Sequence, residues 1–245
     1  GNHEFDWGIE KIFEYFDGDQ SNGEADFPLV NSNIVYYSDG KLVLIDGYNI
    51  CQSLMLEKNG LKIGVVSCIG DVYSSILYSK TKDYLFNPVV KATEQLAKSL
   101  KDQGADMILV NIHDGNADDI KSYSANTQLA QLKYNGKYLI DIVINGHTHT
   151  KQLAYIERSG ANMPVIQCGG NGENIGEIEL YYDTVSEELT YSYACHYDVQ
   201  FTASNNYDVN VQNVIDEHYA SIKHIIDEVY CVSSETISDR SQLYD

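Results

Sequence analysis

Positively charged residues are scarce in this sequence. Lysine and arginine together number 16 of the 245 residues, against 36 acidic residues, and the formal net charge is −20. Arg158 and Arg240 are the only arginines. A surface this negative repels nucleic acid polymers and anionic membranes, so we expect neither as a partner. Solubility is the alternative explanation for most of the acidic residues.

Cysteine pairs and long apolar runs are also missing. The five cysteines stand far apart, at Cys51, Cys68, Cys168, Cys195 and Cys231, and none belongs to a CxxC pair. This scatter argues against a disulfide framework and against a cysteine-based zinc site. No apolar run reaches the roughly 18 residues of a membrane helix, so no membrane segment is predicted in this chain. The first residues show no signal segment either.

Apolar residues make up 43% of the chain, which is enough to bury a core. Three continuous apolar runs, 61–70, 106–115 and 138–150, are typical of strands buried in a sheet. Helices are predicted at 8–16, 88–103, 118–134 and 208–230, and further strands at 27–36, 42–45, 51–57, 152–157, 163–168, 175–182 and 188–198. Strands alternate with helices and a run of strands follows, so the pattern predicts an α/β or α+β sandwich.

Turn and cap residues mark several of these boundaries. Asp39-Gly40 and Asn59-Gly60 are predicted to form hairpin turns, because both residue types accept a positive φ. Asn87 is the predicted N-cap of the helix at 88–103, with Pro88 as its first residue.

Histidines follow two of the three buried strands. His113 lies in NIHDGN, and His147 and His149 lie in NGHTHT. In α/β sheets, sites lie beyond the carboxyl ends of the strands, so we expect these loops to meet at one edge. On an extended stretch, residues two apart share a face, and neutral imidazoles there suit one or two divalent ions. The alternative for each histidine alone is a solvated loop side chain.

The chain opens on GNHEFDWG, which adds three polar candidates to the same edge. Asn2 offers a neutral oxygen for a metal ion. His3 and Asp6, three residues apart, suit a carboxylate-oriented imidazole that acts as a general acid or stabilises a transition state. The alternative is that Asn2 and Glu4 only cap the helix predicted at 8–16.

Taken in order, GNHE, a strand ending in H-x-G and a strand ending in GHxH resemble the last three of the five motifs of the calcineurin-like metallophosphoesterases. GNHEFDWG resembles the bacterial 5′-nucleotidase/2′,3′-cyclic phosphodiesterase branch, as do FPLVNSNI and MPVIQCGGNGENIGEIEL. The resemblance runs from residue 1 to about residue 230. It implies an α+β four-layer sandwich and the release of phosphate from nucleotides or other small phosphoesters.

The resemblance also implies a role for each candidate residue. Asn2, His113 and His147 would ligate one metal ion, and His149 would ligate a second. The ions are two divalent metals of the group Mn, Zn, Fe and Co, and they would supply the positive charge that the chain lacks.

The catalytic roles implied by the resemblance fall on His3 and Asp6. His3 would contact the phosphate and help the leaving group depart, while Asp6 holds its ring. No residue is indicated for binding the rest of the substrate. Export to the periplasm, cell wall or outside of the cell is usual for this branch.

The family's first two motifs, D-x-H and G-D-x-x-D, have no counterpart here. Asp71 follows Ile69-Gly70 and superficially mimics the second motif, but its place in the chain differs. We therefore expect an N-terminally truncated metallophosphoesterase domain at 1–230 that lacks its first strands, with incomplete metal sites. Residues 231–245 would begin a missing nucleotide-binding domain.

Two alternatives to an active hydrolase stay open. The first is a catalytically inactive fragment or degenerate fold without a complete metal site, which would bind at most one ion. The second is a binding module whose acidic surface meets a basic partner, and that binding would weaken steeply with salt.

Overall fold

The computed structural model describes residues 1–70, 75–114, 124–186, 188–199 and 207–229, together with Val72 and Val232. The chain divides into two compact units, Gly1–Gln200 and Phe201–Asp245. The domain limits of 1–230 and 231–245 stay a prediction, because beyond residue 229 only Val232 is among the described residues.

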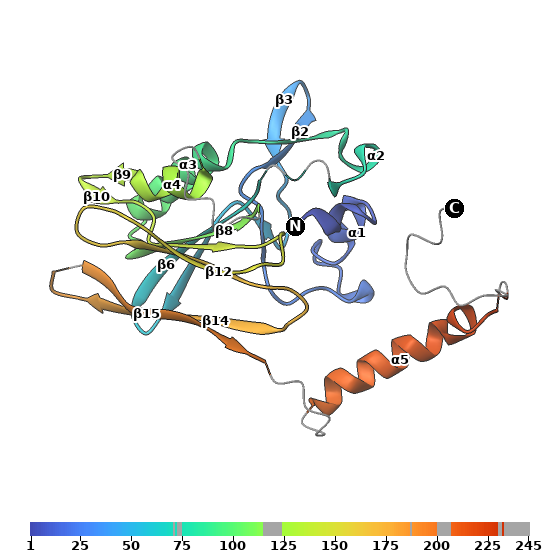
Figure 1. The fold of residues 1–245 in the computed structure, drawn as a ribbon. Helices are drawn as coiled ribbons and strands as arrows, with labels where there is room; N and C mark the ends of the chain where they lie inside the picture. Colours follow the sequence, from blue (N-terminus) through green and yellow to red (C-terminus); the bar gives the residue numbers. More distant parts are fainter. Residues whose placement is uncertain are drawn as a thin grey trace. The chain divides into compact units, whose positions relative to one another are not determined.

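A six-stranded sheet in the order β12-β13-β11-β8-β6-β5 forms the centre of the first unit (Figure 1). Its strands are β5 (Leu54–Lys58), β6 (Leu61–Ile69), β8 (Met107–His113), β11 (Ile142–Asn145), β12 (Lys151–Ile156) and β13 (Met163–Cys168). β6, β8, β11 and β13 are mutually parallel, and β5 and β12 are antiparallel edge strands. The three apolar runs therefore supply three adjacent central strands, as predicted, and their carboxyl ends meet at one edge.

Helices α3 (Val89–Asp102) and α4 (Ala125–Gln131) lie against one face of this sheet (Figure 1). α3 turns Val89, Ala92, Ala97 and Leu100 inward at helical spacing. The larger hydrophobic core lies beneath the two helices and includes Val66, Ile108, Val110, Leu129, Leu139, Val143 and Val165. This packing fixes the sheet that carries the histidine loops.

The N-terminal segment builds a second core against the opposite face of the sheet. It contains the 3₁₀ helix η1 (Asn2–Phe5), helix α1 (Ile9–Glu14) and the 3₁₀ turn η2 (Gln20–Asn22). The buried members of this core are Phe5, Ile9, Phe16, Ile45, Ile50, Ile69, Val72 and Ile76. The predicted helix at 8–16 is confirmed, although it is shorter than expected.

Smaller sheets complete the first unit. They are β1 (Leu29–Val30) with β4 (Ile50–Cys51), β3 (Lys41–Leu44) with β2 (Ile34–Ser38) and β7 (Tyr84–Phe86), β9 (Lys133–Tyr134) with β10 (Lys137–Tyr138), and β14 (Asn174–Asp183) with β15 (Glu188–Asp198). A short helix, α2, spans Tyr78–Thr81. Positive φ values at Asp39-Gly40 and Asn59-Gly60 confirm both predicted hairpin turns.

Three predicted element boundaries are wrong. The strand expected at 27–36 is split, because the Asn31 side chain bonds to Ile34 and Ile45 and turns the chain. The helix expected at 118–134 ends at Gln131, because the chain then enters the β9–β10 hairpin, whose turn is Asn135-Gly136. Residues 118–123 lie outside the described part. The helix after Asn87 has Pro88 at its N-cap.

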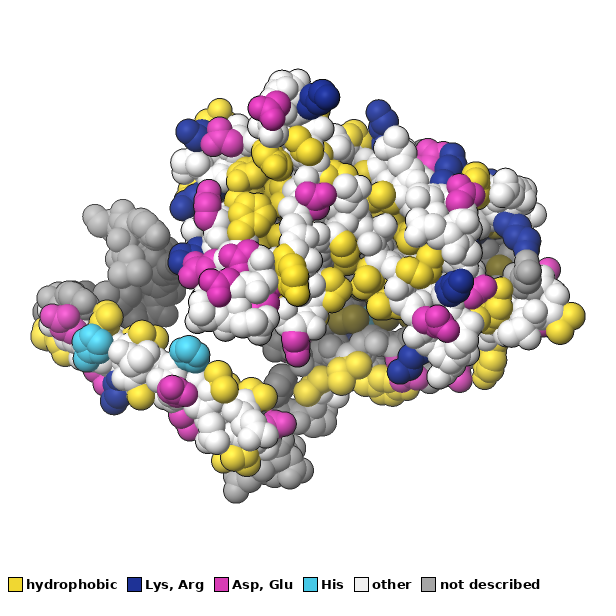
Figure 2. Space-filling view, turned by 180° about the vertical axis from the view of Figure 1, so that it is seen from behind, with side chains coloured by type: hydrophobic (Ala, Val, Ile, Leu, Met, Phe, Trp, Pro, Cys, Tyr) yellow, Lys and Arg dark blue, Asp and Glu magenta, His cyan; other side chains and the backbone are white. Residues whose placement is uncertain are grey.

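The described part of the second unit contains one long helix, α5 (Val209–Ile226), which confirms the helix predicted at 208–230. Asp208 caps it by accepting hydrogen bonds from the backbone N–H groups of Asn210 and Val211. Figure 2 shows apolar side chains along this helix, and Val211, Ile215 and Ile222 are among its exposed residues. Among the described residues, no helix is both long and apolar enough to span a membrane.

Asp141, directly before β11, gives a pH-dependent prediction. Its carboxylate accepts a 2.7 Å hydrogen bond from the Ile108 N–H, and burial raises its pKa above the ordinary 3.8 despite the nearby positive charges of Lys101 and Arg158. The folded chain therefore retains this proton at a pH where the unfolded chain has lost it. The stability that Asp141 contributes is present below about pH 4 and is lost as pH rises through the folded pKa, by up to about 1.4 kcal/mol per pH unit.

Urea unfolding of the wild type and of Asp141→Asn between pH 4 and pH 7 checks this prediction. The amide can accept the same hydrogen bond but does not titrate. The free energy of unfolding of the wild type, relative to that of Asp141→Asn, should decrease as pH rises. A difference that stays constant across this range would show that the Asp141 pKa is not raised in the folded state.

Candidate active site

Helix η1 positions two pairs of side chains on opposite sides. In a 3₁₀ helix, residues three apart lie above one another. Asn2 and Phe5 are both buried, and the Phe5 ring packs against Tyr84 and Phe86 at centroid distances of 6.0 and 5.6 Å. His3 and Asp6 share the exposed side, where His3 Nδ1 lies 2.7 Å from Asp6 Oδ2. Phe5 therefore anchors the helix and leaves the His3–Asp6 pair facing solvent.

Asn2 lies between two histidines from different strand ends. His113 Nε2 lies 2.7 Å from Asn2 Oδ1, and His147 Nδ1 lies 3.3 Å from the same oxygen. The two imidazole rings are 5.2 Å apart between centroids. His113 ends β8, and His147 follows β11, the neighbouring parallel strand. The structure thus brings together three of the four predicted metal ligands at the carboxyl edge of the sheet.

Two glycines allow this close approach. A Cβ atom on Gly1 would lie 2.7 to 2.9 Å from the His113 ring, and one on Gly146 would lie 3.2 Å from His113 Nδ1. Neither distance leaves room for a side chain without a shift. Contact with the His113 ring therefore explains why glycine precedes Asn2 in GNHE and His147 in NGHTHT.

His147 and His149 have unusual backbone conformations, with φ values of 81° and 55°. The prediction that both lie on an extended stretch is wrong, because β11 ends at Asn145 and the loop bends directly after it. Positive φ is rare for histidine and is found at functional sites held by their surroundings. Because of this bend, the His147 ring and the His149 ring have different neighbours. His147 joins Asn2, while His149 lies against Gly170, where an added Cβ would come within 3.0 Å of the ring.

The His113 ring is partly buried. Burial, with a smaller contribution from His147, lowers the pKa of His113 to about 4. The ring is therefore neutral at pH 7, which is the form that can ligate a metal.

The donor set at Asn2 fits one divalent ion. Two atoms each about 2.1 Å from an ion, at angles of about 90° to 110°, lie about 3.0 to 3.4 Å apart. The 3.3 Å separation of His147 Nδ1 from Asn2 Oδ1 falls in this range, and the 2.7 Å separation of His113 Nε2 from the same oxygen is shorter. Neutral imidazole and amide oxygen are both suitable ligands. Within the described part of the chain, no three His, Cys, Asp or Glu residues are grouped to hold a metal. Asp71 lies outside that part.

Two polar residues near this edge were not predicted from the sequence. Asn145, the last residue of β11, has a buried Oδ1 atom that finds no hydrogen-bond partner among the described residues. Asp114 follows His113 and packs so closely on Gly70 that an added Cβ would lie 2.0 Å from its Cγ. For Asn145 and Asp114 alike, the sequence offered one sign of a site, which is a polar residue at the end of a buried strand.

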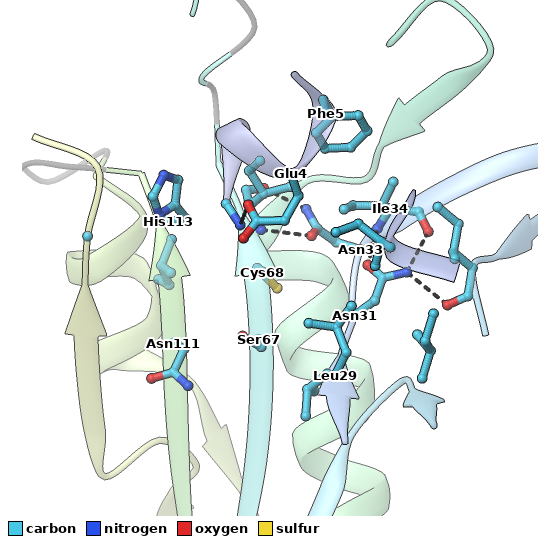
Figure 3. Close-up of a pocket in the computed structure, with 18 of the residues that line it drawn as sticks. Glu4, Phe5, Leu29, Asn31, Asn33, Ile34, Ser67, Cys68, Asn111 and His113 are labelled. Carbon is cyan, nitrogen blue, oxygen red and sulfur yellow. Dashed lines mark hydrogen bonds and ion pairs between the residues drawn. The ribbon is translucent and has the colours of Figure 1, made fainter. Parts of the chain in front are cut away.

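A cavity of about 350 Å³ opens beside this site. Glu4 and His113 lie at one end, and Leu29 and Asn111 at the other (Figure 3). Most of its wall is apolar and comes from the second core, including Ile9, Ile12, Phe13, Ile45, Ile50 and Ile69.

No family model matches this sequence. Three curated proteins are similar to part of this sequence. They are a 2′,3′-cyclic-nucleotide 2′-phosphodiesterase/3′-nucleotidase of Salmonella typhimurium (25% identical over 198 residues, 74% of this chain and 29% of that protein), the trifunctional nucleotide phosphoesterase YfkN of Bacillus subtilis (28% over 195 residues, 74% and 13%) and the cell wall protein Lmo0130 of Listeria monocytogenes (22% over 200 residues, 73% and 24%). The chain thus spans less than a third of the length of these relatives.

Solved structures share the fold. The calcineurin-like phosphoesterase YfkN of Bacillus subtilis aligns with a TM-score of 0.65 at 20% identity, over 93% of this chain and 70% of that one. A 5′-nucleotidase precursor of Thermus thermophilus aligns with a TM-score of 0.66 at 17% identity, over 94% of this chain and 43% of that one. These matches confirm the predicted fold class. The chain is therefore similar in sequence to 2′,3′-cyclic-nucleotide phosphodiesterases and nucleotide phosphoesterases, and it shares its fold with a calcineurin-like phosphoesterase and a 5′-nucleotidase.

Proposed function

We propose that the protein hydrolyses phosphate esters of nucleotides or of similar small molecules, and that a divalent metal ion is required. The observation that carries this proposal is the meeting of Asn2, His113 and His147 around one point, beside the exposed His3–Asp6 pair. Asn2 and His3 are consecutive residues of η1, so both groups belong to the same short segment.

The chain's own residues divide the work as follows. Asn2, His113 and His147 would hold a divalent ion, which neutralises phosphate charge and lowers the pKa of bound water. His149 would belong to a second ion. Asp6 fixes the His3 ring through Nδ1, which leaves Nε2 to face the substrate. When water attacks phosphorus and the ester P–O bond breaks, His3 Nε2–H gives its proton to the departing oxygen.

The substrate class and the location follow from the relatives' names. Nucleotide phosphoesters are proposed because the Salmonella and Bacillus relatives are named for them. Export is proposed because one relative is a cell wall protein and a solved neighbour is a nucleotidase precursor. Neither proposal depends on the ends of this chain.

Phosphate release by the 245-residue protein tests the function. AMP, 2′,3′-cyclic AMP and p-nitrophenyl phosphate are incubated with the apo protein, with added manganese or zinc, and with excess chelator. For 2′,3′-cyclic AMP the measured product is 2′- or 3′-AMP, because opening the ring leaves the phosphate on the ribose. We expect release only with added metal, and elemental analysis gives the number of ions per chain. His218→Ala in α5 is the matched control and should release phosphate like the wild type. Release that persists in chelator would refute the proposal.

One observation favours a second candidate, an inactive fold that binds a single ion weakly. Imidazole and amide ligands carry no negative charge, and the described residues place no carboxylate group among them that would make a three-residue metal cluster. This candidate predicts one ion per chain and no phosphate release from any of the three substrates. Two ions per chain together with release would exclude it.

A further inference from the structure

The loop that carries His147 and His149 contains a strained turn. The Thr148 N–H donates to the Gly146 carbonyl at 3.1 Å, which closes a three-residue γ-turn with His147 at its centre. His147 has a φ of 81°, and γ-turns with a positive φ at the central residue are the rare and strained form. A strained conformation persists only when the surrounding structure holds it. The two proposed metal ligands therefore depend on the contacts that hold this loop.

Backbone hydrogen bonds hold both ends of the loop. At its start, the Gly146 N–H donates to the Ile112 carbonyl of β8 at 3.1 Å. At its end, the Gly169 N–H donates to the Thr150 carbonyl at 3.0 Å, and the ladder between β12 and β13 begins at the next pair of residues. These bonds fix where the loop begins and ends. The conformation between those points needs a further contact.

Thr148, between the two histidines, supplies such a contact through its side chain. Its hydroxyl donates to Gln167 Oε1 at 3.1 Å and lies 2.9 Å from the Thr150 hydroxyl. A threonine hydroxyl has one proton, so Thr150 is the donor in the second of these bonds. The side chain of Thr148 therefore ties the middle of the loop to strand β13.

Gln167 is a firm anchor, because it is buried and has contacts on two other strands. Its surface is 1% exposed. Its Nε2 donates to Gln152 Oε1 at 3.4 Å, and these two residues are directly opposite each other in the ladder between β13 and β12. Its backbone carbonyl accepts a 2.8 Å hydrogen bond from His196 Nε2 on β15. The Oε1 atom that meets Thr148 therefore belongs to a residue that the sheet holds in place.

We infer that Thr148 and Gln167 are positioning residues for the metal site, and that the hydrogen bond between them holds the γ-turn at His147 in the conformation that presents both imidazoles. Neither side chain would touch the ion or the substrate. The inference deepens the proposed function and rests on it for the identity of the metal ligands. Removing a group that orients metal ligands typically weakens metal binding roughly 10- to 100-fold.

Substitution of Thr148 in the 245-residue protein tests the inference. Thr148→Val removes the hydroxyl and keeps the branched shape, and the residue is exposed, so the variant should fold. Titration of the apo protein with manganese and with zinc should show a loss of roughly 10- to 100-fold in affinity for the tighter ion. Thr148→Ser keeps the hydroxyl and should restore most of this affinity. Gln167→Met removes the acceptor and should match Thr148→Val.

Thr190→Val is the matched control. It makes the same change at an exposed position of β15, opposite Tyr181 in the β14–β15 hairpin, and should bind the ion like the wild type. A second readout uses the apo protein alone. The NMR signals of the His147 and His149 rings should shift in Thr148→Val, return in Thr148→Ser and stay in place in Thr190→Val.

A double variant separates positioning from a general effect on stability. If the Thr148 hydroxyl acts through His147, adding Thr148→Val to His147→Gly should change the affinity for the tighter ion by less than roughly twofold, because the ligand that it positions is gone. A hydroxyl that only stabilises the fold would lower the affinity by the same factor in both backgrounds.

Three results would overturn the inference. They are wild-type affinity in Thr148→Val, an equal loss in Thr148→Ser, and an equal loss from Thr148→Val with and without His147. The expected affinities without phosphate release would refute the hydrolase and support the inference. If the wild type bound neither ion, the proposed function would fail, and unchanged ring signals in Thr148→Val would then overturn the inference as well.

Discussion

Replacing His3 with alanine should lower metal-dependent phosphate release by roughly 10²- to 10⁴-fold, which is the range for loss of a general acid. The bond from Nδ1 to Asp6 holds the ring, and 77% of the His3 side chain is exposed, so Nε2 is open to substrate. His3 is not among the donors around Asn2 Oδ1. Metal affinity, measured by titration of the apo protein, should therefore stay within roughly twofold of the wild type.

Two further measurements separate chemistry from structure at this position. Added imidazole should restore part of the activity of His3→Ala, because the exposed site leaves room for it. Asp6→Asn should give a smaller loss, since the amide can still accept from Nδ1 but carries no charge. If His3→Ala loses metal and activity in equal measure, His3 is a ligand and the role proposed for it is wrong.

Replacing His147 with glycine should weaken binding of the tighter divalent ion by roughly 100-fold or more, because it removes one of three donors. Glycine is the appropriate replacement, since His147 has a φ of 81° and glycine adopts that conformation without strain. The melting temperature of the apo protein should therefore not fall. Manganese and zinc titrations of the wild type and the variant measure the change.

His149→Gly is the matched control for this experiment. It also has positive φ, at 55°, but its ring lies against Gly170 and not beside Asn2. We expect it to leave the tighter ion in place and to affect only a second, weaker one. Equal loss in the two variants would assign both histidines to the same ion.

Much of the fold could be predicted because its signals are local. The continuous apolar runs predicted the central strands, and the paired turn residues at 39–40 and 59–60 predicted two hairpins. The missed details depend on distant partners. The strand at 27–36 is broken by Asn31 bonding to Ile45, which lies fourteen residues further along the chain. The local pattern of apolar residues gives no information about that contact.

In the candidate site too, local contacts could be predicted from the sequence and details set by distant residues could not. The spacing of His3 and Asp6 predicted their contact, because residues three apart in one short helix must meet. The meeting of Asn2 with His113 spans 111 residues and followed only from the expected topology. The positive φ of His147 could not be predicted, since histidine seldom adopts it and the constraint comes from the surrounding fold.

The cavity beside β1 also couples folding to occupancy. The cavity of about 350 Å³ has a wall that is more apolar than polar, and apolar surface that a bound molecule covers there contributes roughly 25 cal/mol per Å². Anything that fills the space in the native state alone therefore raises the melting temperature in proportion to the logarithm of its free concentration. The melting temperature should therefore report on any molecule that binds in this cavity.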